Sequence, residues 1–540
     1  MNDLQSNGNN SVNSSFTIGL TLVATLGGLL FGYDTAVISG AVGSLQYFFI
    51  DSIYQNTELA KSVIIEYRIT VSVVTLTVLF AVNAILMRLL GKTKGLIISA
   101  ILLVLMVSVL YSAFSGSPEL TEKTANSIKG FIVSSALVGC IIGGSIGGFV
   151  SRQYGRKKGL ILAAFLFTIS AIGSAIPETL NFFGTEDVSS FIVYRIIGGI
   201  GVGLASMLSP MYIAEIAPSN IRGKLVSWNQ FAIIFGMLVI YFVNYFIARQ
   251  GDDAWLNNTG WRWMFASETI PAFLFLLLLL FVPETPRYLV MQNRAEEANT
   301  VLTKLVGPQS AGHVLKEIKE SLSTKDAPWL SYGGLLIIIG ILLSVFQQFV
   351  GINVVLYYAP EIFKSMGSNT DASLLQTIIV GSVNLIFTVV AIVTVDKFGR
   401  KPLQIIGALG MAFSMIALGL TFYFQSVGIG ALMFMLIYIA SFAVSWGPVV
   451  WVLLSEIFPN RIRGAMSIAV AAQWLANLII SWTFPMMNDN TWLNDKFHHG
   501  FAYWIYGIMG ILAALFMWRL VPETKGKTLE EMEHLWKPRV

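Results

Sequence analysis

The sequence predicts an all-α polytopic membrane protein made of two homologous halves. Of its 540 residues, 55% are hydrophobic and only 12% are charged, whereas soluble domains carry about 25% charged residues. Apolar stretches of about 20 residues, each long enough to cross a bilayer as a helix, recur along the whole chain. Three polar motifs occur twice in the same order. These observations indicate an integral membrane protein with an internal duplication.

Fourteen apolar stretches are long enough to be transmembrane helices. The predicted spans are 16–48, 69–90, 94–115, 128–150, 159–177, 189–213, 225–248, 262–283, 332–358, 374–395, 402–424, 429–454, 464–487 and 501–521. Residues 1–15 lack the basic start and cleavage site of a secretory signal, so we expect the first stretch to remain as a helix. The longest polar break, 284–331, has the charge pattern of a helical linker.

Lys and Arg are distributed unevenly between the connecting loops. One set of loops is rich in them and holds Arg88, Lys92, Lys94, Arg152, Arg156, Lys157, Lys158, Arg222, Lys224, Lys397, Arg400, Lys401, Arg461 and Arg463. The opposite loops hold few, such as Lys61, Lys123, Arg249 and Lys364. Because basic loops stay on the cytoplasmic side, we expect both termini, residues 1–15 and 522–540, in the cytoplasm. The linker 284–331 falls on the same side, which predicts a multi-pass membrane protein with both termini and the linker in the cytoplasm.

An internal repeat divides the chain. GFVSRQYGRKK (148–158) recurs as VDKFGRKP (395–402), and PMYIAEIAPSNIRGK (210–224) recurs as PVVWVLLSEIFPNRIRGA (448–465). VPETPR (282–287) likewise recurs as VPETKG (521–526). The nearly constant offset predicts two six-helix halves, 16–283 and 332–521, in the parallel-repeat construction of a secondary transporter.

Two of the fourteen spans are left over when the halves are aligned. They are 69–90 and 94–115, which we interpret as a hairpin (about 69–115) inserted between the first and second core helices. The basic turn RLLGKTKG (88–95) then falls on the cytoplasmic side, as the distribution of basic residues requires. A lipid-facing structural hairpin and a docking surface for another subunit both fit these residues.

The first span carries a carboxylate, Asp34, inside GGLLFGYDTAVISG (27–40). A charged side chain at the centre of a bilayer-spanning helix costs roughly 2.5 kcal/mol or more, so such residues usually face a cavity and have a function. Arg195, a cation inside another predicted span, is its expected partner. Either this pair serves only packing, or Asp34 is a proton or substrate site. In the second case a small movement of Arg195 would switch the affinity of Asp34 for a proton.

The duplicated motifs place charged residues at the cytoplasmic ends of both halves. The candidates for a cytoplasmic gate are Arg156, Glu215, Arg222 and Glu284 with their counterparts Arg400, Glu456, Arg463 and Glu523. Ion pairs between the halves would stabilise the state in which this side is closed. Topology anchoring by positive charge is the alternative explanation.

Uncharged polar and aromatic residues gather in a few of the spans. They are Asn229, Gln230, Gln347, Gln348, Asn353, Tyr357, Tyr358, Asn384, Trp446, Gln473, Trp474 and Asn477. Amides donate and accept hydrogen bonds, and aromatic faces cover the apolar surface of a sugar, so this set suits a sugar cavity. Each residue taken alone also fits an ordinary interhelical hydrogen bond.

The repeated SRxYGRK, E…RG and PET motifs, PETKGKTLEE (522–531) and QQFVGIN (347–353) resemble the sugar porter family of the major facilitator superfamily. The resemblance covers about 16–50 and 125–537 and is strongest to the bacterial, proton-coupled D-xylose members. It implies alternating access between two six-helix bundles with a monosaccharide at the midplane. Met237 occupies a position where these members are expected to have Gln, which puts the choice between pentose and hexose in doubt.

The resemblance also assigns residues. It implies sugar contacts at Phe31, Gln230, Gln347, Gln348, Asn353, Tyr357, Asn384, Trp446, Gln473 and Trp474. It gives no such support to Asn229 and Asn477. It implies proton coupling through Asp34, Arg195 and Glu268.

We therefore expect a proton:sugar symporter that imports D-xylose first, with other pentoses or glucose next. A passive sugar uniporter and a non-transporting sugar sensor are the alternatives. An enzyme is not expected, because the spans show no nucleophile–base set, metal cluster or phosphate loop. The single Cys140 and the four histidines give no metal-ligand spacing, so neither cofactor nor metal is predicted. The expected partners are the sugar, the proton and the lipid bilayer, with no nucleic acid, and a monomer is expected.

Overall fold

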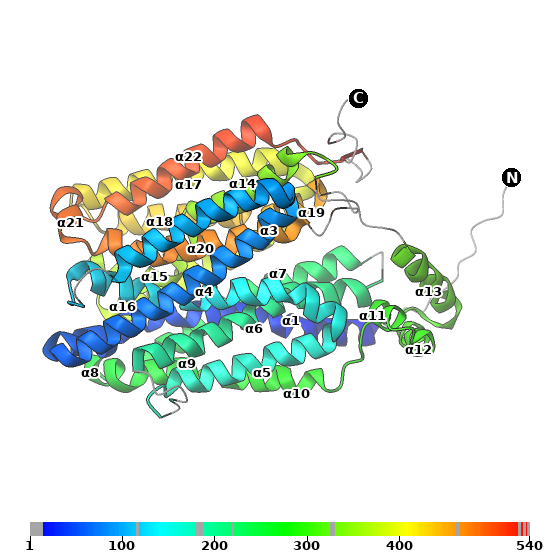
Figure 1. Cartoon of the computed structure of the whole chain (residues 1–540), viewed down its shortest axis with the longest axis horizontal. Helices are drawn as coiled ribbons and strands as arrows, with labels where there is room; N and C mark the ends of the chain where they lie inside the picture. The colour runs from blue at the N-terminus through cyan, green and yellow to red at the C-terminus, as the bar shows by residue number, and fades with distance from the viewer. Residues whose placement is uncertain are drawn as a thin grey trace.

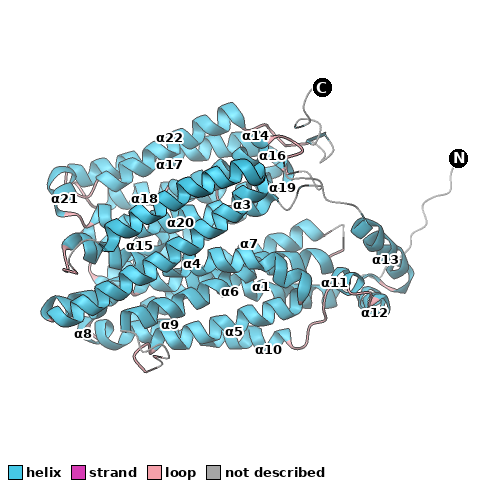
Figure 2. Cartoon of the chain, in the orientation of Figure 1, coloured by secondary structure: helices cyan, strands magenta, loops and turns pink. Residues whose placement is uncertain are grey.

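The protein is all-helical in the part that the computed structural model describes. Described are residues 14–114, 118–179, 181, 187–218, 221–323, 330–458, 462, 465–526, 531–532 and 536. Figure 2 shows helices and loops, and no strand, in these ranges. Thirteen helices are long and apolar enough to cross a membrane. The predicted fold class, an all-α polytopic membrane protein, is confirmed.

The first half contains helices that pack along one another (Figure 1). Its long helices are α1 (Ser14–Val37), α3 (Thr57–Phe114), α4 (Glu122–Gln153), α5 (Arg156–Ala175), α6 (Asp187–Ile216), α7 (Arg222–Ala248), α9 (Trp261–Ser267) and α10 (Thr269–Leu279). Short turns of helix connect them: η1 (Ile38–Gly40), α2 (Val42–Leu45), η2 (Gln46–Ile50), η3 (Asp51–Gln55), α8 (Asp253–Trp255) and η4 (Leu256–Gly260).

Three linker helices lead to the second half. They are α11 (Pro286–Met291), α12 (Ala295–Val306) and α13 (Pro308–Ser323), and they lie at one end of the bundle, on the right in Figure 1. The second half consists of α14 (Gly334–Phe349), α15 (Ile352–Ser365), α16 (Thr370–Phe398), α17 (Arg400–Tyr423), α18 (Ile429–Val444), α19 (Pro448–Ile457), α20 (Met466–Asn488), α21 (Thr491–Phe497) and α22 (Phe501–Leu520). The short α21 lies at the opposite end, on the left in Figure 1.

The segment predicted as an inserted hairpin is helical from Thr57 to Phe114 and forms α3. The Ser99 hydroxyl donates to Asn83 Oδ1, sixteen residues earlier, although residues that far apart in a straight helix are about 24 Å apart. The chain therefore reverses within α3, and Figure 1 shows its two arms side by side. The first arm begins earlier than the predicted residue 69. It qualifies as a span over Thr57–Phe80, while Gly95–Ser108 is a shorter apolar helix. The fourteenth span stays a prediction.

The duplicated motifs form matching hydrogen-bond networks. In the first half, Gly155 precedes α5 with a φ of +95°, and the Arg156 N–H donates to Glu284 Oε1 at 3.1 Å. The Arg156 guanidinium pairs with Glu215 at 2.7 Å, and the Thr285 hydroxyl donates to the same carboxylate at 2.6 Å. Burial raises the pKa of Glu284 above its ordinary value, and backbone N–H donors act in the opposite direction.

The second half repeats each of these contacts. Gly399 has a φ of +92°, and the Arg400 N–H donates to Glu523 Oε1 at 3.1 Å. The Arg400 guanidinium pairs with Glu456 at 2.8 Å, to which the Thr524 hydroxyl donates at 2.5 Å. The repeat in the sequence is therefore a repeat of local structure. We call the end of the bundle that holds these two networks the basic end.

We predict that Gly155→Ala destabilises the protein. The backbone at Gly155 is left-handed, and an added Cβ would lie 2.2 Å from Glu284 Oε2. Such strain costs about 1–3 kcal/mol, so the melting temperature of the purified protein in detergent should fall. Gly312→Ala is the matched control, because Gly312 lies in α13 with no heavy atom within 4 Å of an added Cβ. Equal melting temperatures for the two variants would contradict the prediction.

Candidate functional site

A cavity of about 1440 Å³ lies between the two halves. Its walls come from α1, α6, α7 and α10 of the first half and from α14 to α20 of the second. Gly223, Lys224 and Arg400 line it as well, so the cavity extends to the basic end. No part of the lining comes from the α3 hairpin.

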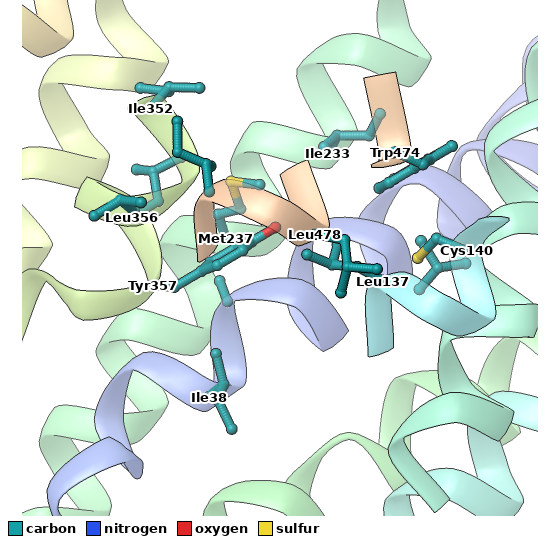
Figure 3. Packing of buried hydrophobic residues seen from close by; sticks show 14 of the residues in the cluster. Ile38, Leu137, Cys140, Ile233, Met237, Ile352, Leu356, Tyr357, Trp474 and Leu478 are labelled. Carbon is teal, nitrogen blue, oxygen red and sulfur yellow. The ribbon is translucent and has the colours of Figure 1, made fainter. Parts of the chain in front are cut away.

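Nine of the ten predicted sugar contacts line this cavity. They are Phe31, Gln230, Gln347, Gln348, Asn353, Tyr357, Asn384, Gln473 and Trp474. Figure 3 labels Met237, Tyr357 and Trp474, which converge from α7, α15 and α20. Residues far apart in the sequence thus surround one space, as the resemblance implied.

A break between α14 and α15 brings Gln347, Gln348 and Asn353 to the cavity. Gly351 takes a φ of +93°, a conformation that side-chain-bearing residues rarely adopt. An added Cβ would also lie 2.8 Å from the Tyr506 ring. The break leaves backbone carbonyls without helical partners, and the Tyr438 hydroxyl donates to that of Val350 at 2.8 Å.

The amides at this break form a directional chain. Asn353 Nδ2 donates to Gln348 Oε1 at 2.5 Å, and Gln348 Nε2 donates to Gln347 Oε1 at 3.5 Å. Gln347 Nε2 in turn donates to the carbonyl oxygens of Trp446 at 2.8 Å and Gly447 at 3.3 Å. These two carbonyls belong to the second helix break, between α18 and α19. Each break thus helps to satisfy the polar groups of the other.

Trp446, the tenth predicted contact, does not line the cavity. Its side chain is fully buried, and its indole N–H donates to the carbonyl oxygen of Gln404 in α17 at 2.8 Å. The backbone carbonyl oxygen of Trp446 accepts a hydrogen bond from Gln347, which lines the cavity, so Trp446 contributes to the cavity wall only indirectly. The sequence showed that Trp446 lies at a helix break but not which way its ring turns.

Two residues left out of the predicted contacts also line the cavity. Asn229 and Asn477 are both among its walls, and Asn229 Oδ1 is buried without a hydrogen-bond partner. Asn477 Nδ2 lies 3.4 Å from the Tyr357 hydroxyl. The place of Asn477, four residues after Gln473, was a usable signal, because residues four apart share a helix face. The adjacent position of Asn229 and Gln230 gave no such signal.

The first half contributes a largely apolar wall. Ile233, Ile234 and Met237 of α7 line the cavity together with Phe31 of α1. The ring of Phe31 lies 5.6 Å from that of Trp474 in the other half. Asn229 and Gln230 of α7 add amides to this wall. The cavity therefore combines aromatic and apolar surface with amides from both halves, which suits a sugar ring.

A buried ion pair lies beside this wall. Arg195 Nη1 of α6 is 2.7 Å from Asp34 Oδ1 of α1, and both side chains are at most 1% exposed. Arg195 Nη2 also donates to the Asp34 carbonyl oxygen at 3.0 Å. Glu268, between α9 and α10, is fully buried, and electrostatic interactions link it to both residues. Asp34 Oδ2 and both Glu268 carboxylate oxygens have no hydrogen-bond partner in the described part of the chain.

The predicted gate residues pair within each half. Arg156–Glu215 belongs to the first half and Arg400–Glu456 to the second. Arg222 is exposed, and Arg463 lies outside the described residues. Because the cavity extends to this end, pairing between the halves stays a prediction for the closed state.

The family model for sugar (and other) transporters matches residues 20–536. The chain belongs to this family. It is 56% identical to the D-xylose-proton symporter of Escherichia coli K12, over 98% of each chain. It is 42% identical to the glucose facilitated diffusion protein of Zymomonas mobilis, over 78% of this chain and 91% of that one.

Solved structures support the same assignment. An inward open structure of the xylose transporter XylE from E. coli is 54% identical, with a TM-score of 0.77, and covers 96% of this chain and 100% of that one. XylE bound to 6-bromo-6-deoxy-D-glucose, described as a major facilitator superfamily proton:xylose symporter, is 55% identical with a TM-score of 0.72. The match covers 97% of this chain and 100% of that one. This member of the sugar transporter family is therefore a transporter with the major facilitator fold, and not an enzyme.

We predict that Arg195→Leu strongly destabilises the transporter. It would leave Asp34 charged and buried without its cation, and removing one partner of a buried pair costs about 3–5 kcal/mol. Arg195→Leu combined with Asp34→Asn removes both charges and should recover much of that loss. Melting temperatures of the four proteins in detergent form a double-mutant cycle. A double variant as unstable as Arg195→Leu would show that the two residues are not coupled.

Proposed function

We propose that this protein is a proton-coupled symporter that imports a monosaccharide, D-xylose first, by alternating access. The observation that carries the proposal is the amide- and aromatic-lined cavity between the halves, with a buried Asp34–Arg195 pair beside it. The 56% identity to a D-xylose-proton symporter over nearly the whole chain supports both the substrate and the coupling ion.

The sugar is proposed to bind between the amides of the second half and the apolar wall of the first. Its hydroxyls would exchange hydrogen bonds with Gln347, Gln348, Asn353 and the other lining amides, while its C–H faces pack on aromatic rings. In the inward-open state Trp446 acts indirectly, because its backbone carbonyl oxygen accepts a hydrogen bond from the Gln347 amide and so orients that amide. A contact from Trp446 to the sugar belongs to other states of the cycle.

Proton coupling is proposed to work through Asp34. A proton on Asp34 neutralises the carboxylate and releases Arg195, so α1 and α6 lose the charge contact that joins them. Phe31 lies one turn before Asp34 on α1 and faces the cavity, so movement of α1 changes the sugar site. Glu268, buried beside the pair, is the proposed second carboxylate of the proton path.

The remaining assignments follow from the charges. We propose that the basic end faces the cytoplasm, because the basic loops gather there, and that Arg156, Glu215, Arg222, Glu284 and their counterparts form the gate on that side. We also propose the division into halves 16–283 and 332–521 with the linker 284–331, and a monomer in the bacterial inner membrane.

A passive sugar uniporter is the second candidate. One relative is a glucose facilitated diffusion protein, and it is 42% identical to this chain. The fully buried Asp34–Arg195 pair favours symport, because a carrier with no proton to move gains nothing from a buried, titratable carboxylate.

Counterflow of labelled D-xylose in proteoliposomes tests the substrate. Vesicles loaded with unlabelled xylose should accumulate labelled xylose transiently, and competition by a panel of pentoses and hexoses at two pH values ranks the substrates. Xylose that neither exchanges nor competes would overturn the proposed substrate.

We predict that Asp34→Asn abolishes proton-driven accumulation but keeps sugar binding and counterflow. Asparagine retains the size of the side chain, but it can neither bind nor release a proton. Uptake against a gradient under an imposed proton-motive force should fall to the level set by equilibration, while exchange continues. Uphill uptake retained by the variant would refute the assignment of Asp34.

We predict that Met237→Gln changes the preference among sugars. Met237 lines the cavity with a thioether that cannot bind a hydroxyl strongly, whereas a glutamine there would donate and accept. The variant should gain affinity for sugars with a hydroxyl facing α7, by about tenfold for one good hydrogen bond. Competition in the counterflow assay measures the change. Leu238→Gln, also on α7 but absent from the cavity lining, is the control and should leave the ranking as it is.

A further inference from the structure

The end of the bundle opposite the basic end is closed by contacts between α4 and the α20–α21 connection. Trp482 Nε1 of α20 donates to the carbonyl oxygen of Ser127 of α4 at 3.0 Å, and the Trp482 ring lies 5.1 Å from Phe131. At Gly130 the two backbones approach so closely that an added Cβ would lie 2.1 Å from the Trp482 carbonyl oxygen. The two halves therefore touch without a gap here.

A charged contact continues this closure. Lys129 Nζ of α4 lies 2.7 Å from Asp489 Oδ2, just after α20, with side chains 11% and 28% exposed. Asn126 Nδ2, one turn earlier, donates to the Asp489 carbonyl oxygen at 3.2 Å. A lysine ammonium that is this well buried needs a partner for its charge. Asp489 supplies it from the other half.

A second carboxylate contact lies at the very start of α4. The two Glu122 oxygens accept from the N–H of Thr491 at 2.7 Å and from its hydroxyl at 2.6 Å. The acceptor is on the first half and both donors are at the first residue of α21, in the second half. Donor and acceptor are therefore exchanged relative to the ion pair, in which Lys129 of the first half donates to Asp489 of the second.

The ion pairs at the basic end behave differently. Arg156–Glu215 and Arg400–Glu456 each stay within one half, whereas Lys129–Asp489 joins the halves. Separating the halves at the basic end leaves the first two pairs intact. Separating them at the opposite end breaks the contacts of Lys129 and Glu122 and exposes their charges to water.

We propose that Glu122, Lys129, Asp489 and Thr491 form an extracellular latch, and that Lys129 and Asp489 are positioning residues that set the balance between inward- and outward-facing states. The latch contacts form when the cavity opens to the cytoplasm and break when the cavity opens outward. The free energy of these contacts therefore contributes directly to the equilibrium between the two states. This inference rests on the proposed function for alternating access and for the orientation. None of the four residues lines the sugar cavity, so the latch acts on the states and not on sugar contacts.

The latch shares a helix with the sugar site. Gln473 and Trp474 of α20 line the cavity, and Asp489 follows the end of the same helix. A sugar that draws α20 toward the first half would tighten the latch, and loss of the latch would free α20 to move away. The two sites are thereby connected through one helix.

Labelling of a cavity cysteine from outside tests the latch. Leu356 of α15 lines the cavity and is 3% exposed, so Leu356→Cys reacts with a membrane-impermeant maleimide added outside only when the cavity opens outward. The native Cys140 is fully buried, and protein without Leu356→Cys gives the background. The measurement needs neither sugar nor a proton gradient.

Lys129→Met and Asp489→Asn, each placed in the Leu356→Cys protein, should label about tenfold faster than the parent, which corresponds to about 1.4 kcal/mol in the balance of states. Lys123→Met is the matched control, because Lys123 lies on the same helix but is exposed, and it should label at the parental rate. Lys129→Asp combined with Asp489→Lys restores an opposite-charge pair and should return the rate toward that of the parent.

Parental labelling rates in both single variants would overturn the latch, as would an equal increase in Lys123→Met. A charge-swapped protein that labels as fast as the single variants would also contradict it. Because the two single variants change different helices, misfolding of one leaves the other and the charge swap as tests. Failure of xylose counterflow with the labelling pattern intact would contradict the proposed substrate and leave the latch standing.

Discussion

The buried contact between Asp34 and Arg195 is the interaction on which the rest of the structure depends. Two opposite charges lie 2.7 Å apart with almost no exposure, in a place where either one alone would be very costly. They join α1 to α6 inside the first half, next to the wall that faces the cavity. In the proposed mechanism, a proton on the carboxylate breaks this contact and so links proton binding to the position of α1.

The charged contacts at the two ends of the bundle differ. At the basic end each half keeps its own network of Arg, Glu and Thr, and the Arg–Glu pair and the Thr–Glu hydrogen bond recur in both. At the opposite end charged side chains cross between the halves. In the observed conformation the charged contacts between the halves are thus at the end opposite the basic end, and the networks at the basic end link residues within each half.

The helices and the networks at their ends could be predicted from the sequence, because they depend on residues that are close together in the chain. Apolar length gives the helices, and the duplicated glycine, arginine and glutamate motifs predict duplicated networks at helix ends. Eight of the nine cavity residues belong to the polar and aromatic set that the apolar stretches display, whereas Phe31 came only from the family resemblance. The family resemblance then supplied the arrangement that brings these helices together.

What could not be predicted depends on contacts between distant segments. Lys129 and Asp489 are 360 residues apart, and the sequence around neither residue indicates that the other is its partner. Lys129 also lies inside the predicted span 128–150, so position alone did not single out Arg195 as the partner of Asp34. The turn of the Trp446 ring toward Gln404 and the start of α3 at Thr57 are likewise set by packing.

The most direct measurement of the central claim follows the proton itself. D-xylose is added to a lightly buffered suspension of de-energised cells that express the protein, and a pH electrode records the medium. Entry of protons with the sugar should make the medium alkaline, and a protonophore should remove the signal. Xylose uptake with no change in external pH would contradict the account and leave a passive carrier.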